Sequence, residues 1–197
     1  MASTVSRWAT EVPGNFRFTF KLSKFISHAK GLEFNASDVE KFISIINAAG
    51  NQKACLLVQF PAGIKVEKFE QFQILLECIQ AENHENLWKV AVEFRHPSWY
   101  CHNVYDLLEH YKASLVIHDM PGSVTPMSVA TDVNFVYLRF HGPDGKYRGS
   151  YDDAFLRQYE DFIRKRIDEG KTVYCYFNNT MGDALNNLQT LNNMLES

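Results

Sequence analysis

Along the chain, short strand-like runs of hydrophobic residues alternate with segments in which hydrophobic residues have the spacing of a helix. Six short runs are rich in β-branched and aromatic residues and are too short for a buried helix, which predicts β-strands. These runs cover residues 16–21, 54–60, 88–95, 114–119, 134–141 and 172–178. Between them, apolar residues recur at the spacing of one helix face, which predicts helices. The helices are expected from Ser37 onward and over residues 66–81, 104–111, 152–168 and 181–195, with a short helix at residues 6–11.

Local signals mark where two of these helices begin. Ser37 and Glu40 have the spacing of a capping box, in which each side chain accepts a hydrogen bond from a backbone N–H at the helix start. The helix over residues 152–168 follows Ser150 or Tyr151 and has acidic residues in its first turn.

Alternating strands and helices predict a parallel sheet, because parallel neighbours need a crossover that a helix supplies. Two architectures share this order of elements. An open doubly wound sheet usually has a Gly-rich ligand loop after an early strand, and the sequence contains no G-x-G-x-x-G or Walker pattern. A closed barrel instead collects polar side chains at the carboxyl ends of several strands.

All six predicted strands end in polar side chains. These are Lys21, Gln59, Glu93 with Arg95, His118 or Asp119, Arg139 with His141, and Tyr176 with Asn178. Contact of strand ends with solvent explains part of this pattern, but it would favour Lys and Glu over His, Arg, Gln and Asn. The pattern therefore favours a TIM-type (β/α) barrel with a site at the carboxyl ends of its strands.

Composition narrows the class of protein further. The chain has 197 residues, 46% of them hydrophobic, which suits a single domain with a sizeable core and excludes a disordered chain. The 20 Lys and Arg residues are outnumbered by 23 Asp and Glu and form no cluster, so we expect no nucleic-acid partner. The N-terminus lacks a signal-peptide core and no apolar stretch is long enough to span a membrane. We therefore expect a cytoplasmic protein without a membrane partner.

The four cysteines are widely spaced and form no Cys-x-x-Cys pair or Cys/His cluster. They are Cys55, Cys78, Cys101 and Cys175. We expect buried thiols in a reducing compartment and no zinc site. The residues indicate no particular cofactor.

The densest polar segment ends at Trp99 and contains Glu93, Arg95 and His96. A carboxylate, a guanidinium and an imidazole could supply a base, an anion-binding group and an acid, with Trp99 as a wall of the pocket. Glu93 and Arg95 lie two residues apart on one strand face, so they could equally pair with each other or with neighbouring strands. The spacing leaves both interpretations open.

Two further segments place polar side chains after later strands. Arg139 and His141 point to the same face and precede a Gly-rich loop over residues 143–151 that is long enough to act as a mobile lid. A buried Arg or His without a polar partner is costly, so both require a network or a ligand. The segment over residues 176–182 leads into the last predicted helix, whose free N–H groups beside amide side chains would suit an anion. Alternatively, Asn179 or the threonine after it simply caps that helix.

Five ordered motifs resemble the YecE-like family, catalogued as domain of unknown function 72 (DUF72). They are Ser-His at 27–28, Gln-Phe-Pro at 59–61, Glu-Phe-Arg-His-Pro-Ser-Trp at 93–99, Arg-Phe-His-Gly at 139–142 and Tyr-Phe-Asn-Asn at 176–179. Their order and spacing match the family from about Trp8 to the C-terminus. The resemblance implies a TIM-type barrel and a candidate site, but no reaction, because the family has no established activity.

The chain departs from the family pattern in two ways. Ser27-His28 stands where the family usually has Thr-His, which keeps a hydroxyl beside the imidazole. The family's first two βα units, with their Gly-Thr-Ser-Gly-like and Glu-Asn-x-x-Phe-Tyr-like strands, are not found in the sequence. A complete barrel of about 250 residues uses about 31 residues for each βα unit. We therefore expect an incomplete TIM-type (β/α) barrel, with about six of eight βα units in a single, N-terminally short domain over residues 1–197.

Two hypotheses for function remain open, and the sequence does not decide whether the protein is an enzyme. In the first, it performs acid–base chemistry on a small anionic molecule, a phosphate or carboxylate compound. Glu93, His141 and His28 are then the candidates for proton transfer. The candidate ligand-binding residues are Lys21, Gln59, Arg95, His96, Trp99, Arg139, Tyr176, Asn178 and Asn179. The cationic side chains among them would hold the anion.

A metal-dependent variant of this enzyme would use carboxylate and imidazole ligands at the strand ends. The ligands would be Glu93, His118, Asp119 and His141. No recognisable ligand motif supports this variant, and we expect no metal site.

In the second hypothesis, the protein binds a ligand without catalysis or serves as a scaffold, because part of the family's pocket is missing. The strands over residues 16–21 and 172–178 would then have exposed edges. Exposed strand edges favour association, so in this case we expect either a homo-oligomer or a partly open, marginally stable barrel.

Overall fold

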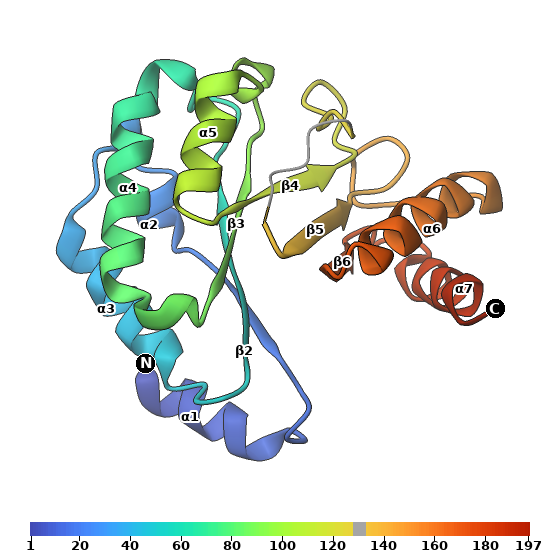
Figure 1. The fold of residues 1–197 in the computed structure, drawn as a ribbon, viewed down its shortest axis with the longest axis horizontal. Helices are drawn as coiled ribbons and strands as arrows, with labels where there is room; N and C mark the ends of the chain where they lie inside the picture. Colours follow the sequence, from blue (N-terminus) through green and yellow to red (C-terminus); the bar gives the residue numbers. More distant parts are fainter. Residues whose placement is uncertain (128–132) are drawn as a thin grey trace. The chain divides into compact units, whose positions relative to one another are not determined.

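The computed structural model describes residues 1–127 and 133–197 (Figure 1). In this part of the chain, strands alternate with helices. The strands are β1 Phe18–Lys21, β2 Lys53–Gln59, β3 Lys89–Glu93, β4 Ser114–His118, β5 Phe135–Phe140 and β6 Thr172–Phe177. The helices are α1 Ala2–Glu11, α2 Lys24–Ser27, α3 Ala36–Asn47, α4 Phe69–Glu82, α5 His102–His110, α6 Asp153–Asp168 and α7 Ala184–Glu196. Short 3-10 turns occupy Lys30–Leu32, Val66–Lys68, His84–Asn86 and Pro97–Trp99.

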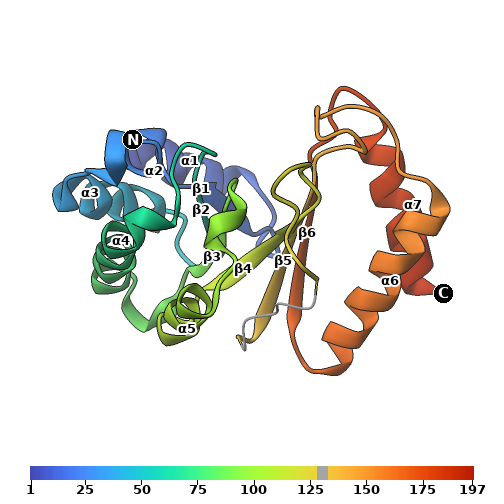
Figure 2. The same ribbon diagram turned by 90° about the horizontal axis from the view of Figure 1, so that it is seen from above.

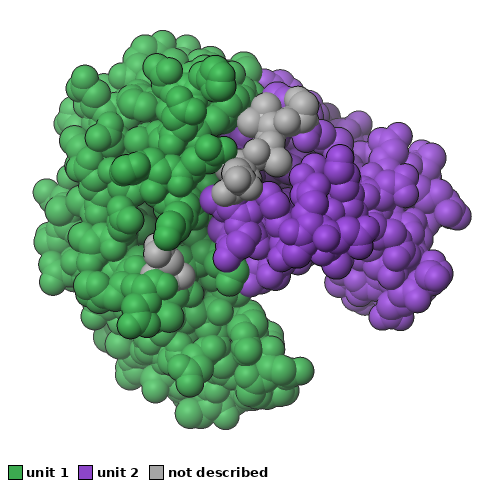
Figure 3. Space-filling view, in the orientation of Figure 1, with its two compact units in different colours: residues 1–113 green, residues 114–197 purple. Residues whose placement is uncertain are grey.

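The chain divides into two compact units, which we describe separately: unit 1, Met1–Ala113, and unit 2, Ser114–Ser197 (Figure 3). In unit 1, β1, β2 and β3 are parallel and follow one another in chain order. Helices α3 and α4 lie together on one side of these strands (Figures 1 and 2). Their apolar faces bury Val39, Ile43, Phe72 and Leu76 in the core, where burial of apolar surface stabilises the fold.

Four aromatic rings fill the core of unit 1 at the carboxyl ends of β2 and β3. Phe60 follows β2, Phe94 follows β3, and both stack on Trp99, at ring-centroid distances of 5.9 and 4.6 Å. Phe72 of α4 packs edge-on against Phe94 at 5.4 Å. Such offset and edge-to-face pairs add to the burial energy of each ring.

In unit 2, β4, β5 and β6 are also parallel and follow one another in chain order. The register places Arg139 of β5 between His118 of β4 and Tyr176 of β6. Helices α6 and α7 lie side by side against this sheet (Figures 1 and 2). Between the helices and the strands, Leu138 and Phe140 of β5 are fully buried in one hydrophobic cluster.

Sequential strand order distinguishes the two architectures that the sequence allowed. In a doubly wound sheet the strand order reverses at a switch point. In each unit here, every strand pairs in parallel with the strand that precedes it along the chain, as in a barrel. The predicted class is confirmed: six parallel strands alternating with helices form an incomplete α/β barrel. That residues 1–197 form a single domain stays a prediction.

The predicted strands match the observed ones within two residues at each end, but the predicted helix starts are less accurate, and α1 begins at Ala2 instead of residue 6. Helix α3 begins at Ala36, one residue before the expected Ser37 cap, and Asn35 at its N-cap makes no side-chain hydrogen bond. Helix α6 is capped by Asp152, whose carboxylate accepts from the Phe155 N–H at 2.8 Å. Helix α7 begins three residues later than expected.

The cysteines only partly match the expectation of buried thiols. Cys55 is buried, Cys78 and Cys175 are partly buried, and Cys101 is exposed. Burial raises the pKa of Cys55 to about 12, so its thiol stays protonated. Among the described residues, we find no helix with the length and apolar character needed to cross a bilayer.

Candidate functional site

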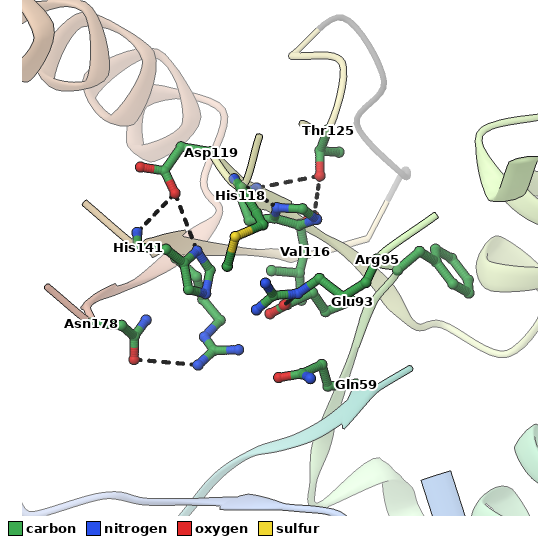
Figure 4. A network of polar contacts seen from close by, with 12 residues as sticks. Gln59, Glu93, Arg95, Val116, His118, Asp119, Thr125, His141 and Asn178 are labelled. Atoms are coloured by element: carbon green, nitrogen blue, oxygen red, sulfur yellow. Dashed lines mark hydrogen bonds and ion pairs between the residues drawn. The ribbon is translucent and has the colours of Figure 1, made fainter. Parts of the chain in front are cut away.

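In unit 1, the polar residues at the strand ends pair with each other. Lys21 donates from Nζ to Oε1 of Gln59 on the neighbouring strand at 2.9 Å. Glu93 is fully buried and forms a short ion pair with Nε of Arg95, whose side chain is 10% exposed (Figure 4). The sequence left open whether Glu93 and Arg95 serve a ligand or pair with each other, and the structure shows that they pair with each other. A guanidinium partner favours the ionised carboxylate, which suits a base better than an acid.

The three remaining candidate residues of unit 1 differ in their burial and in their contacts. Trp99 is fully buried in the aromatic core and donates from Nε1 to the Ile64 carbonyl at 2.8 Å, so it is a core residue rather than a pocket wall. His96 is the N-cap of the 3-10 turn that follows, because its Nδ1 accepts from the Ser98 backbone N–H at 3.2 Å. The same nitrogen lies 2.9 Å from the Ser98 hydroxyl. His28 is exposed, and its Nδ1 lies 2.9 Å from the Ser27 hydroxyl.

The pKa of His28 is lowered from its ordinary value by partial burial and by the charges of Lys21 and Lys24. His28 is therefore neutral at physiological pH. A neutral imidazole can accept a proton, so His28 is suited to a base and not to binding an anion by charge.

Two polar contacts of unit 2 join Asp119, which directly follows β4, to His141, which directly follows β5. One carboxylate oxygen of Asp119 accepts from the His141 backbone N–H at 2.8 Å and lies 3.1 Å from His141 Nδ1 (Figure 4). Because an ionised carboxylate only accepts hydrogen bonds, Nδ1 of His141 carries the proton. Nε2 is then the basic nitrogen of the neutral ring. The parallel register of β4 and β5 brings these residues together, because both lie at carboxyl ends of adjacent strands.

The other oxygen of Asp119 accepts a short hydrogen bond from the Tyr151 hydroxyl. That hydroxyl in turn accepts from the Gly142 N–H at 2.5 Å. Burial, together with the hydrogen bond to Asp119, raises the pKa of Tyr151, so its hydroxyl remains a donor. Both carboxylate oxygens of Asp119 are thus held in place.

A second histidine beside His141 has the opposite tautomer. The Met120 N–H donates to Nδ1 of His118 at 3.2 Å, so the proton of neutral His118 is on Nε2. The two rings lie perpendicular, with centroids 5.9 Å apart. The different partners of Nδ1, a carboxylate for His141 and a backbone N–H for His118, therefore assign different tautomers to two residues of the same type.

Arg139 and Asn178 form a separate contact on the neighbouring strands. The Arg139 guanidinium donates to the Asn178 side-chain oxygen at 3.3 Å (Figure 4). Both side chains are partly exposed. Tyr176 of β6, two residues before Asn178, stacks on Tyr137 at a centroid distance of 4.8 Å. The amide orients the guanidinium, which keeps its other N–H groups in a defined direction.

Asn179 does not cap the last helix, whose N-cap is Asp183. Its side chain is fully buried and donates to the Gly149 carbonyl at 2.9 Å and to the Asn187 side chain at 3.0 Å. The backbone N–H groups of residues 181–183 are donated to carbonyl oxygens. Asn179 therefore connects the end of β6 to α7, which corrects the interpretation of Asn179 as a helix cap. An anion-binding role of this segment stays a prediction.

The Gly-rich loop after β5 is tied to neighbouring segments by backbone hydrogen bonds and close packing, and its role as a mobile lid stays a prediction. The Tyr147 N–H donates to the His141 carbonyl at 2.7 Å, and the Met181 N–H donates to the Tyr147 carbonyl at 2.9 Å. A Cβ on Gly182 would overlap the Gly149 carbonyl oxygen. Opening the loop would break these hydrogen bonds and this close backbone packing.

A pocket of about 480 Å³ in unit 2 opens onto Asp119 and Tyr151. Its other lining residues are Val124, Pro143, Ser150, Asp152, Phe155 and Tyr159. Among the described residues, two carboxylates and no cationic side chain line it, so its charge does not suit an anion.

The proposed metal ligands do not form a cluster. Across residues 1–127 and 133–197, no three His, Cys, Asp or Glu side chains are placed so that they could hold a metal ion. The side-chain arrangement thus gives no support to the metal-dependent variant.

Sequence comparison assigns the family. A family model described as protein of unknown function DUF72 matches residues 1–197. The chain belongs to the DUF72 family. Among curated proteins, none matches it.

Two solved structures of DUF72 proteins are similar to the chain over its whole length. The crystal structure of a DUF72 family protein from Thermotoga maritima MSB8 is 24% identical, with a TM-score of 0.84, and 80% of its chain is covered. The one from Enterococcus faecalis V583 is 25% identical, with a TM-score of 0.77 and 84% of its chain covered. These similarities agree with the fold described above.

Two residues of this DUF72 protein's site were missed in the sequence. Tyr151 follows the Gly-rich loop and looks like a helix start, and nothing local to it indicates a contact with Asp119. Asn187 lies four residues before the buried Leu191 on α7, so it occupies the apolar face of the helix. A polar residue on a buried face could have indicated a hydrogen-bonding role.

The buried tyrosines of this DUF72 protein predict a loss of stability at alkaline pH. Burial and the charge of Asp119 raise the pKa of Tyr159 to about 12. An unfolded tyrosine ionises near pH 10, so this stabilisation is complete below pH 10 and is lost as the pH rises through 12. We expect Tyr159→Phe to reduce the stability lost between pH 9 and pH 12 by on the order of 2 kcal/mol. Urea unfolding at both pH values measures this, and an unchanged pH dependence in the variant would contradict it.

Proposed function

We propose that the protein is an enzyme that performs acid–base chemistry on a small anionic molecule at the carboxyl ends of its strands. The observation that carries this proposal is the hydrogen bond between Asp119 and Nδ1 of His141. A carboxylate on Nδ1 selects the tautomer in which Nε2 accepts a proton, and it stabilises the imidazolium that forms. His141 is the proposed general base.

Arg139 is the proposed anion-binding residue. It lies two residues before His141 on β5, and side chains two apart on a strand point to the same face. Its guanidinium is partly exposed and oriented by Asn178, and a guanidinium binds carboxylate or phosphate through paired N–H groups. The positive charge of the guanidinium defines the ligand class as an anion, which includes both phosphate and carboxylate compounds.

A second candidate function is ligand binding without catalysis, and the burial of two proton-transfer candidates favours it. The side chains of Glu93 and His141 are fully buried, and each already has a carboxylate or guanidinium partner. A polar network of this kind can serve only to hold strands together. Strands β1 and β6 end the strand order of their units, and every residue of β6 is at least partly exposed, which supports association through a strand edge. The cytoplasmic location stays a prediction.

A turnover screen separates the two candidates. The wild type is incubated with a panel of small phosphate and carboxylate compounds, and products are detected by NMR. We expect His141→Asn to lower any turnover found by at least about 100-fold, as the loss of a general base does. Glu93→Gln tests the carboxylate among the proton-transfer candidates, and Asp161→Asn, at an exposed position of α6, is the matched control. Turnover and ligand binding that neither His141→Asn nor Glu93→Gln changes would refute the catalytic proposal.

A further inference from the structure

The Tyr151 hydroxyl connects the Asp119 carboxylate and the Gly142 N–H, and each of these groups has only one possible role in a hydrogen bond. Asp119 can only accept from it, and the Gly142 N–H can only donate to it. The hydroxyl proton is thus directed at the carboxylate. Tyr151 is 6% exposed, and in the interior a hydrogen bond of this kind is strong and its loss is costly.

The backbone of Tyr151 is held by a side chain of α7. Asn187 accepts from the Tyr151 N–H at 3.2 Å and donates to the Tyr151 carbonyl at 3.1 Å. It also donates to the Ser150 hydroxyl at 3.1 Å and accepts from Asn179 at 3.0 Å. An amide that satisfies both backbone groups of one residue fixes the position of that residue. The Tyr151 ring is further held by stacking on Phe155 at 4.4 Å.

These contacts form one continuous chain within unit 2. It leads from Asn187 of α7 through Tyr151 to Asp119 after β4, and from there to His141 after β5. Since one oxygen of Asp119 is held by Tyr151, the other oxygen stays directed at Nδ1 of His141. Without the hydroxyl, the carboxylate keeps only the two donors of His141, both on one oxygen, and it can rotate about its Cβ–Cγ bond.

We propose that Tyr151 is a positioning residue, held by Asn187, that keeps the Asp119 carboxylate on His141 and thereby selects the basic tautomer of His141. The consequence for catalysis rests on the proposed acid–base function. The positioning itself can be measured without any substrate.

The test is a measurement of the His141 tautomer by NMR on the full chain labelled with ¹⁵N-histidine. His141→Asn assigns the signals. In the wild type we expect His141 with its proton on Nδ1 and His118 with its proton on Nε2. In Tyr151→Phe we expect the Nδ1-protonated population of His141 to fall by at least about half, because the carboxylate loses its second hydrogen bond. His118 should not change.

Two further variants make the test specific. Tyr159→Phe removes a hydroxyl from a tyrosine in the same aromatic cluster and should leave the His141 signals unchanged. Asn187→Ala keeps the Tyr151 hydroxyl but removes its support, and we expect a shift of His141 in the same direction as in Tyr151→Phe. It keeps the proposal testable should Tyr151→Phe fail to fold.

The outcomes distinguish this proposal from the proposed function. A wild-type His141 signal in both Tyr151→Phe and Asn187→Ala would overturn the positioning role, whatever the turnover screen finds. A tautomer change in both variants supports it, even where His141→Asn leaves turnover unaltered and the catalytic proposal fails.

Discussion

Asp119→Ala is expected to destabilise the protein by on the order of 4 kcal/mol, because the side chain accepts three hydrogen bonds in the interior. Its removal leaves the Tyr151 hydroxyl and two donors of His141 without their acceptor. Buried donors that lose their partner carry the full cost of desolvation. Urea unfolding followed by circular dichroism measures the change in the free energy of unfolding.

Two comparisons make this result interpretable. Asp161→Ala removes a carboxylate from an exposed position of α6 and should change stability by less than about 0.5 kcal/mol. Asp119→Asn retains one acceptor but presents an N–H donor where Tyr151 or His141 also donates, so an intermediate loss is expected. Equal stability of Asp119→Ala and Asp161→Ala would show that the Asp119 contacts contribute nothing to the fold.

Gly142→Ala is expected to cost a similar amount, roughly 2–6 kcal/mol, through backbone strain and overpacking. Gly142 has φ of +90°, which a residue with a Cβ rarely adopts. A Cβ there would also overlap the carbonyl oxygen of Arg148. The loop after β5 would have to move, and the hydrogen bond from the Gly142 N–H to Tyr151 would be lost with it.

Gly170→Ala is the matched control for this substitution. Gly170 follows α6 with a similar φ of +77°, but a Cβ there meets no atom within 4 Å. It should cost about 1 kcal/mol from the backbone conformation alone. The difference between the two variants in thermal unfolding therefore measures the overlap with Arg148. A loss no larger than that of Gly170→Ala would contradict the close packing of the loop.

The strands were predictable because their signal is local. Short runs of β-branched and aromatic residues indicate strands whatever surrounds them. The spacing of Arg139 and His141 likewise shows that both point to one face. The helix starts were less predictable, because capping depends on backbone conformation: Asn35 and Asp152 occupy N-cap positions where the sequence pointed to Ser37 and to Ser150 or Tyr151.

The partners of the candidate site were predictable only where they are close in sequence. Glu93 and Arg95 lie two apart, and their ion pair was one of the interpretations that the spacing allowed. Tyr151 reaches Asp119 only through the path of a loop, which depends on left-handed backbone at Gly142 and on its packing against other segments. The role of Asn187 depends in addition on where α7 lies. Such contacts follow from tertiary structure rather than from local pattern.

The central claim is that Arg139 and His141 mark a site for a small anion. The most direct test is a titration of the ¹⁵N-labelled protein with inorganic phosphate and, separately, with acetate, followed by NMR of side-chain and backbone N–H groups. We predict saturable shifts of the Arg139 guanidinium and the Asn178 amide, and at least about tenfold weaker binding by Arg139→Met, because a charge-assisted contact is lost. Shifts confined to the exposed Lys146 and Arg148 of the loop, with the same affinity in Arg139→Met, would contradict the claim.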